Sequence, residues 1–216
     1  MVGRGVIDLY YMPGAASMAP HLVLEEIGTD YRLVRVRRDG GKSEPPEFAS
    51  LSPHGRVPVM VDGDLVMYES AACVMHLCDT HPDAGLAPEL GTPERALWYR
   101  WLTYLTNTVQ ATFIHAFYPV RGTADPAGEE GVKAKAEADL AGMRNHIEGE
   151  LEHGGPYLLG EAFSSADIYL FMLTRWGRRI EPKWWDQPAL GAHFRSIFER
   201  PAAQRMWEQE GLDPWP

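Results

Sequence analysis

Two residues at the start of a predicted helix are of the kinds that bind a small charged ligand. Glu69 and Ser70 follow a predicted strand and begin that helix. A helix N-terminus presents free N–H groups and positive dipole, which suit a carboxylate. Glu69 can receive an ammonium group, so one zwitterionic amino-acid end would satisfy both residues. The alternative is that Ser70 caps the helix and Glu69 is a favourable first-turn charge.

A second segment, residues 11–17, joins the first predicted strand to the first predicted helix. In an α/β sheet this turn lies at the carboxyl edge, where ligands bind. Ser17 stands at the start of the helix, so its hydroxyl and its backbone N–H can face a developing anion. The alternative is that Ser17 only caps the helix.

A third segment places Val57 and Pro58 at the start of a predicted strand. Proline is confined to positions where the sheet needs no N–H donor. In the cis form, Pro58 would turn the backbone N–H and C=O of Val57 toward a ligand. The alternative is an ordinary edge-strand proline.

The elements that must position these residues alternate along the first 80 residues. Strands are predicted at 6–11, 31–36 and 57–61, helices at 17–27 and 69–80, and a polar loop at 37–46. The pair Asp62-Gly63 predicts a hairpin to a returning strand at 65–67. The first β-α-β unit implies a parallel pair, and the hairpin adds an antiparallel edge. This is the order of a thioredoxin-like fold, in which the proline at position 58 is typically cis.

The second half of the chain follows a different pattern. Helices are predicted at 93–117, 129–152, 167–176, 188–198 and 202–209, with no further strands. The first of these is expected to bury a face formed by Leu97, Trp101, Leu105 and Thr108. Ser164 and Asp167 have capping-box spacing at the start of a buried helix. The predicted fold class is therefore α/β followed by all-α: a thioredoxin-like domain at 1–82, a linker at 83–92 and a helical domain at 93–216.

Composition narrows the class of protein. The 216 residues are 45% hydrophobic and 23% charged, which is typical of a globular chain with a sizeable core. A net charge of -10 disfavours nucleic acid and anionic membranes as partners. Residues 1–5 show no signal peptide and no apolar run reaches about 18 residues, so we expect a cytoplasmic protein.

The cysteines and histidines predict neither a disulfide scaffold nor a metal site. Cys73 and Cys78 lie five residues apart on a predicted helix and are expected to be small buried groups in a reducing compartment. The eight histidines show no tight metal-ligand spacing, so no metal is expected.

Four ordered segments resemble those of a glutathione transferase over nearly the whole chain. Residues 9–21 resemble the opening of the bacterial beta class, and 53–58 its cis-proline segment. Residues 68–70 and 164–167 resemble the γ-glutamyl-binding turn and the capping motif of the helical domain. The resemblance implies that glutathione, as co-substrate, binds the thioredoxin-like domain, and that an electrophile lies against the helical domain.

The resemblance also implies roles for individual residues. The backbone of Val57, before Pro58, would pair with the cysteinyl backbone of glutathione, and Glu69 with Ser70 would hold its γ-glutamyl end. The residues near its glycyl end would be His54, Arg56 and Lys42.

Two positions depart from the beta class. Ala16 stands where that class has a cysteine, which disfavours a mixed disulfide with glutathione at this residue. His115 and Ala116 fall where that class carries a His-Lys pair, and His115 is expected to be a satisfied core or cleft histidine rather than a base. Ser17 and Tyr11 remain as hydroxyls that would favour the thiolate of glutathione, and we favour Ser17 because it begins a helix.

The sequence thus predicts an enzyme that conjugates glutathione to a small hydrophobic electrophile, in the manner of a detoxifying transferase. Candidates for the electrophile pocket are Met12, Tyr104, Phe113, His115, Phe117 and Trp176. A non-catalytic binding or regulatory protein is one alternative. Another glutathione-dependent reaction, such as isomerisation, dehalogenation or reductive cleavage, is the other. The family is usually homodimeric, and the aromatic residues compatible with a partner surface are Trp98, Tyr99 and Trp101.

Overall fold

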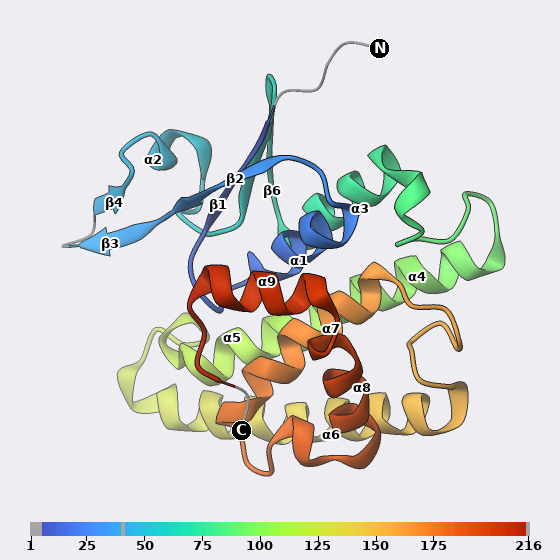
Figure 1. Ribbon diagram of the computed structural model, residues 1–216. Helices are drawn as coiled ribbons and strands as arrows, with labels where there is room; N and C mark the ends of the chain where they lie inside the picture. Colours follow the sequence, from blue (N-terminus) through green and yellow to red (C-terminus); the bar gives the residue numbers. More distant parts are fainter. Residues whose placement is uncertain (1–5, 40–41, 215–216) are drawn as a thin grey trace. The chain divides into compact units, whose positions relative to one another are not determined.

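A mixed four-stranded sheet organises the N-terminal part of the chain (Figure 1). The computed structural model describes residues 6–39 and 42–214, so the stretch 1–5, expected to contain no signal peptide, lies outside it. The strands are β1 (Ile7–Tyr11), β2 (Tyr31–Arg35), β5 (Val59–Asp62) and β6 (Leu65–Tyr68), in the order β2-β1-β5-β6. β1 and β2 are parallel, whereas β5 is antiparallel to both β1 and β6. The predicted parallel pair and antiparallel edge are confirmed.

Two helices of this part of the chain pack against each other: one connects β1 to β2 and the other follows β6. They are α1 (Met18–Ile27) and α3 (Ser70–Thr80), followed by the short helix η1 (Pro82–Ala84). Gly28 ends α1 in the left-handed conformation, at φ 71°, which confirms the predicted stop. Tyr10 packs with Phe48 and Val59 in a small core cluster. The turn after β1 and the start of α3 are thereby supported by a packed sheet.

The segment predicted as a polar loop, 37–46, instead contains a second small sheet. β3 (Arg37–Asp39) pairs antiparallel with β4 (Lys42–Glu44), and the unpredicted helix α2 (Phe48–Leu51) follows them (Figure 1). The loop prediction was wrong because strands of three residues are too short to show an apolar–polar alternation. Backbone hydrogen bonds hold such a pair whatever the side chains are.

The last helix groups with the sheet. α9 (Pro201–Glu210) packs against α1, and the first of two compact units runs to Leu86 and resumes at Phe198. The side chains that α9 buries are Ala202, Ala203, Met206, Trp207 and Glu210. The chain therefore passes from the first unit to the second after Leu86, inside the expected linker, and returns to the first unit just before α9.

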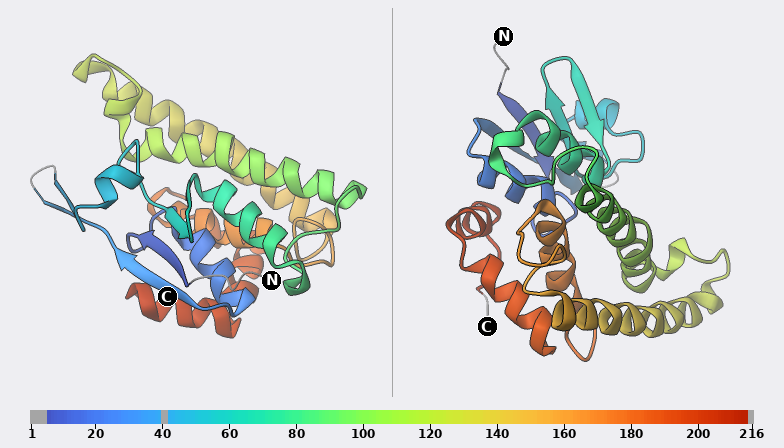
Figure 2. Two further views of the ribbon diagram at one scale, coloured as in Figure 1. Left: turned by 90° about the horizontal axis from the view of Figure 1, so that it is seen from above. Right: turned by 90° about the vertical axis from the view of Figure 1, so that its right-hand side faces the viewer.

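The second unit, Ala87–Ile197, is built from helices. They are α4 (Pro93–Tyr104), η2 (Leu105–Gln110), α5 (Ala111–Phe117), α6 (Glu129–Gly154), α7 (Ser165–Trp176) and α8 (Pro188–Phe198). Short 3₁₀ turns lie between them: η3 (Pro119–Arg121), η4 (Pro126–Gly128), η5 (Gly177–Arg179) and η6 (Trp184–Asp186). α6 lies alongside the run from α4 to α5 in both views of Figure 2. A thioredoxin-like unit with a helical unit is the fold class that the sequence predicted. Within the described ranges no helix has the length and apolar character needed to cross a membrane.

The helix predicted at 93–117 contains a π-helical stretch, η2, and its buried face differs from the predicted one. Trp101 and Leu105 are buried as predicted, but Leu97 is 42% exposed and Thr108 is exposed, with Trp98 and Val109 buried beside them. Beyond Leu105 the prediction carried a 3.6-residue period through η2. A π turn holds more residues than an α turn, so that period fails there.

Two aromatics offered for a partner surface belong to the core instead. Trp98 is fully buried and its Nε1 donates a hydrogen bond to Ser165 Oγ at 3.0 Å. Trp101 is 2% exposed, and only Tyr99 of the three has a large exposed fraction, 39%. The expectation failed for Trp98 and Trp101 because apolar side chains at helical spacing fill a core as readily as an interface.

The predicted capping box at the start of α7 is confirmed. The Asp167 carboxylate accepts hydrogen bonds from the Ser164 backbone N–H at 2.9 Å and from Leu158 N–H at 2.8 Å. His193 Nε2 lies 3.1 Å from the same carboxylate. Because every residue of α7 is buried, these bonds satisfy a helix end that water does not reach.

Candidate functional site

The backbone before β5 is open to a ligand. The peptide bond between Val57 and Pro58 is cis, as the sequence predicted, and Pro58 is buried while Val57 is half-buried. Among the described residues, none forms a hydrogen bond with the backbone N–H or C=O of Val57. These two groups are therefore available to pair with the extended backbone of a peptide-like ligand.

The N-terminus of α3 is also open. Glu69 occupies the N-cap position with φ 69°, and no side chain caps the helix. The first hydrogen bond into the helix runs from Cys73 N–H to Glu69 C=O at 3.0 Å, so the amides before Cys73 need other partners. The capping alternative for Ser70 does not hold. An uncapped helix start beside an exposed carboxylate suits a zwitterionic amino-acid end.

Ser70 links this helix to the turn after β1. Its hydroxyl donates a hydrogen bond of 2.6 Å to the backbone C=O of Ala16. The hydroxyl is therefore committed to the fold, and the part of Ser70 that remains for a ligand is its backbone N–H. Two of the predicted ligand segments, 68–70 and 11–17, are held together by this bond.

Ser17 is fully buried and closes the turn rather than capping α1. Its Oγ accepts from Met12 N–H at 3.3 Å and donates to Met12 C=O at 3.2 Å. No side chain caps α1, so the plain capping alternative does not hold. The Ser17 proton is occupied by a carbonyl, and a bond to a ligand sulfur requires that this bond be exchanged.

Tyr11 ends β1 with a hydroxyl that has no described partner. The side chain is 7% exposed, and its ring centroid lies 6.2 Å from that of His21 on α1. None of the hydrogen bonds found for residues 6–39 and 42–214 involves its hydroxyl. Tyr11 is thus the less committed of the two hydroxyls at this turn.

The loop before Pro58 presents two predicted ligand residues to solvent. His54 and Arg56 are both exposed. Ser52 shapes the loop, because its hydroxyl donates to Arg56 C=O and accepts from Arg56 N–H, each at 2.9 Å. The backbone of Lys42 lies in β4, while its side chain lies outside the described part of the chain.

A carboxylate from α9 reaches the same turn, and local sequence gave no signal for it. Glu210 Oε2 accepts a hydrogen bond from Gly14 N–H at 2.7 Å, and Glu210 Oε1 lies 2.9 Å from His21 Nδ1. The side chains of Glu210 and His21 are both fully buried. Nearly 190 positions separate these partners in the chain, and only the packing of α9 on α1 brings them together.

The residues predicted for an electrophile pocket have different environments. Phe113 is fully buried, with ring centroids 5.0 Å from Trp184 and 6.0 Å from Trp176, so it belongs to the core of the helical unit. Trp176 is 8% exposed, and Phe117 is half-buried beside Phe113.

The other three predicted pocket residues are more accessible. Tyr104 and Met12 are half-buried, and burial raises the pKa of the Tyr104 hydroxyl. His115 was expected to be buried or in a cleft and is exposed instead. That prediction was wrong because His115 lies between Phe113 and Phe117 in sequence, but residues two positions apart point to nearly opposite sides of a helix such as α5.

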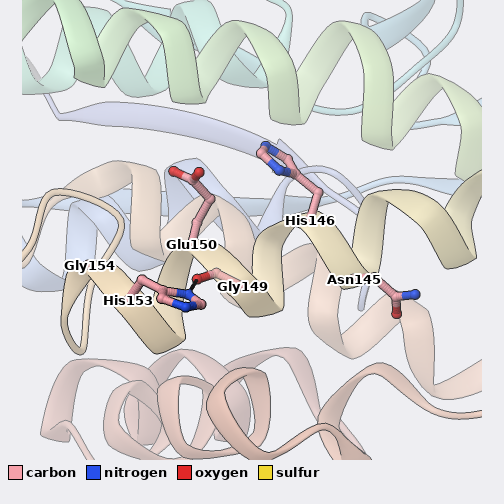
Figure 3. A pocket seen from close by; sticks show the side chains of 6 residues that line it. All are labelled: Asn145, His146, Gly149, Glu150, His153 and Gly154. Atoms are coloured by element: carbon pink, nitrogen blue, oxygen red, sulfur yellow. Dashed lines mark hydrogen bonds between the residues drawn. The ribbon is translucent and has the colours of Figure 1, made fainter.

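A surface hollow of about 440 Å³ lies along α6 (Figure 3). Its lining residues are Asn145, His146, Gly149, Glu150, His153 and Gly154. His146 and Glu150 project from one side of the helix and Asn145 and His153 from the other (Figure 3). None of the predicted site residues lines it. In the part of the chain that the structure describes, no three His, Cys, Asp or Glu side chains are grouped to hold a metal ion.

The two cysteines are buried, as expected, and neither forms a disulfide within the residues that the structure describes. Burial, with a smaller contribution from the charge of Glu69, raises the pKa of the Cys73 thiol to about 12. A thiol with that pKa remains protonated at neutral pH and is a poor nucleophile. Neither cysteine takes the place of a reactive thiol at the turn.

Family models match both halves of the chain. The model described as "Glutathione S-transferase, N-terminal domain" matches residues 5–79, and "Glutathione S-transferase, C-terminal domain" matches residues 105–201. The glutathione S-transferase GstA of Escherichia coli O157:H7 is 28% identical over 212 residues, covering 95% of this chain and all of that protein.

Solved structures match over the same length. The bacterial beta class glutathione S-transferase of Sphingomonas chungbukensis superposes with a TM-score of 0.84 at 30% identity, covering 95% of this chain and 100% of that one. A sphingomonad glutathione S-transferase complexed with glutathione gives a TM-score of 0.84 at 32% identity, with the same coverage.

Proposed function

Because the chain belongs to the glutathione S-transferase superfamily, we propose that it joins the sulfur of glutathione to a small hydrophobic electrophile. The observation that supports this most is the pair of open backbone sites at Val57 and at the start of α3. The free N–H and C=O of Val57 suit the cysteinyl backbone of glutathione, and the uncapped start of α3 suits its γ-glutamyl carboxylate. Glu69 would receive the γ-glutamyl ammonium group.

The proposed reaction is a displacement or an addition by the thiolate. The thiol releases its proton to water and the sulfur forms a bond to an electrophilic carbon. In a displacement the leaving group departs with its electron pair; in an addition the π electron pair of the acceptor shifts away from the new bond and the product takes up a proton from water. A free thiol has a pKa of about 8.5, so only a small fraction is thiolate at neutral pH. A charge-assisted hydrogen bond of about 1.5–3 kcal/mol would lower that pKa by one to two units.

Two hydroxyls are candidates for that hydrogen bond. The position of Ser17 at the start of α1 favours it, because the helix dipole stabilises a nearby anion. Its bond to Met12 C=O would have to be exchanged for a bond to sulfur. The hydroxyl of Tyr11 has no such commitment to a described residue, so both belong in the test.

The test is a glutathione titration that also follows thiolate absorbance against pH. We expect saturable binding and a bound-thiol pKa below that of free glutathione. Either Ser17→Ala or Tyr11→Phe should return that pKa by about one to two units toward the free value. An absence of binding at millimolar glutathione would overturn the proposal.

A non-catalytic glutathione-binding protein is the second candidate. The buried, committed hydroxyl of Ser17 favours it, because a protein that only binds glutathione needs no thiol activation. Glutathione binding with an unshifted thiol pKa would support this candidate. The same result would also fit a glutathione-dependent isomerisation or dehalogenation. Reductive cleavage through a thiol at position 16 is disfavoured, since we take Ala16 to occupy the position of the beta-class cysteine.

Two further features remain part of the proposal. We expect a homodimer, as in the family, which sedimentation of the full chain would test. We also expect a cytoplasmic protein that uses no metal.

A further inference from the structure

Glu210 places one carboxylate oxygen on each side of the Ala16 turn. Oε2 accepts from Gly14 N–H at 2.7 Å, and Oε1 lies 2.9 Å from His21 Nδ1. Gly14 precedes Ala16 in the turn, and His21 follows it in the first turns of α1. A single side chain from α9 therefore spans the segment that carries the candidate glutathione contacts.

Several other hydrogen bonds of this turn are local. Its local bonds run from Ala15 N–H to Met12 C=O and from Met18 N–H to Ala15 C=O, each at 3.1 Å. Gly14 has φ 69°, a conformation that is available to glycine without strain. The bond to Glu210 is charge-assisted and short, and such bonds are roughly twice as strong as neutral ones.

The carboxylate is itself held in place. His21 Nε2 lies 2.7 Å from Gln209 Oε1, and Gln209 Nε2 donates to Glu25 at 2.9 Å. The Glu210 side chain is fully buried, so the imidazole and the Gly14 amide replace the water that it has lost. A buried charge with fixed partners has little freedom to move, which makes it a rigid support for the turn.

We propose that Glu210 is a positioning residue for the glutathione site, acting through the backbone N–H of Gly14. This inference rests on the proposed function and adds to it a residue from the far end of the chain. Glu210 fixes the turn so that the carbonyl of Ala16 meets Ser70 and the hydroxyls of Ser17 and Tyr11 keep their places.

The contact of Glu210 with the turn can be separated experimentally from the packing of α9 on α1. The docking bonds Arg205 Nε to Glu25 at 2.6 Å and Arg200 Nε to Glu26 at 2.6 Å do not involve the turn. Arg200→Ala therefore weakens the docking of α9 and leaves Glu210 in place. Glu208→Gln makes the same chemical change as Glu210→Gln on an exposed side chain of the same helix.

The experiment compares Glu210→Gln with these two controls in the full chain. Gln is nearly the same size as Glu but has one accepting oxygen in place of two, so it cannot accept from Gly14 N–H and from His21 Nδ1 at the same time. Its neutral amide oxygen is also a weaker acceptor for the Gly14 amide than a carboxylate is. We expect Glu210→Gln to weaken glutathione binding about 5–10-fold and to move the bound-thiol pKa toward the free value. Glu208→Gln and Arg200→Ala should stay within about twofold of wild type.

Hydrogen exchange of the Gly14 amide, followed by NMR, gives a readout that does not depend on binding. The amide should be protected in wild type and in both controls and lose protection in Glu210→Gln. If Glu210→Gln binds glutathione with wild-type affinity and with the wild-type thiol pKa, the positioning role is overturned. An equal loss in Arg200→Ala would also overturn it, since docking alone would then explain the effect. Failure of wild type to bind glutathione would instead overturn the proposed function.

Discussion

Glu69 holds a backbone conformation that few residues other than glycine adopt. Its φ of 69° is the only positive value among the described non-glycine residues, and its side chain is exposed. Such conformations cost about 1–3 kcal/mol and concentrate at ligand sites. The strain sits next to the open helix start, at the position proposed to receive the ammonium group of glutathione.

Replacing this residue should therefore improve folding and impair binding. We expect Glu69→Gly to raise the free energy of unfolding by about 1 kcal/mol, because glycine adopts this φ without strain. The same variant should lose most of its glutathione affinity. Urea unfolding and the glutathione titration measure the two effects.

The matched control is Glu69→Gln, which keeps the strained backbone and removes only the charge. It should bind glutathione weakly and unfold like wild type. A Glu69→Gly variant that is less stable than wild type would contradict the assignment of strain. Wild-type binding by Glu69→Gln would show that the carboxylate does not contact the ligand.

At the scale of elements, the contact between α1 and α9 carries a buried acid. Burial alone would raise the pKa of the Glu25 carboxyl, but hydrogen bonds from Tyr31, Arg205 and Gln209 outweigh it and lower the pKa below its ordinary value of 4.5. Burial, followed by the bond to Glu25, raises the pKa of the Tyr31 hydroxyl, so that hydroxyl keeps its proton and remains a donor.

This contact predicts a dependence of stability on pH. Because the pKa of Glu25 is lower in the folded chain, its stabilisation is full above about pH 4.5 and is lost as the pH falls through the folded value. The Glu25→Gln variant should be less stable than wild type at pH 6, and the difference should shrink toward pH 3.5. Urea midpoints at the two pH values measure it. A constant difference would contradict the lowered pKa.

The elements differed in how far sequence could predict them. β1, α1 and α3 have compositions typical of their class with glycine or proline close after their ends, and all three were predicted nearly to the residue. The three-residue strands β3 and β4 show no period and were missed. Trp101 was correctly placed on the buried face of α4, but Leu97 was not, because Leu97 and Trp98 are both apolar and the pattern does not choose between them.

The candidate site divides in the same way. Sequence indicated Val57, Pro58, Glu69 and Ser70 as candidates because each belongs to a short local motif. It could not show the hydrogen-bond partners of the Ser17 and Ser70 hydroxyls, which depend on the folded structure. It missed Glu210 entirely, because nothing near that residue signals a contact with Gly14. Local motifs indicate candidate ligand groups, whereas the contacts that support those groups come from distant parts of the chain.

At the scale of the whole molecule, the first compact unit is discontinuous in sequence. The chain leaves this unit after Leu86 and enters it again at Phe198. We expect a fragment of residues 1–86 to be unfolded, because without α9 it leaves the buried face of α1 uncovered and His21 without Glu210.

Circular dichroism and amide NMR spectra of that fragment test this. Adding a peptide of residues 198–216 should recover native-like spectra, and the same peptide carrying Glu210→Gln should do so less well. A fragment of residues 1–86 that folds by itself would show that α9 is dispensable for the unit.

The return of α9 also sets an order of events during synthesis. About 110 residues of the helical unit leave the ribosome between the two parts of the first unit. At 5–20 residues per second, α1 waits on the order of ten seconds for the helix that covers it. During that interval its apolar side chains and the imidazole of His21 are accessible to chaperones. The portion of the chain that is made first is therefore the portion whose folding is completed last.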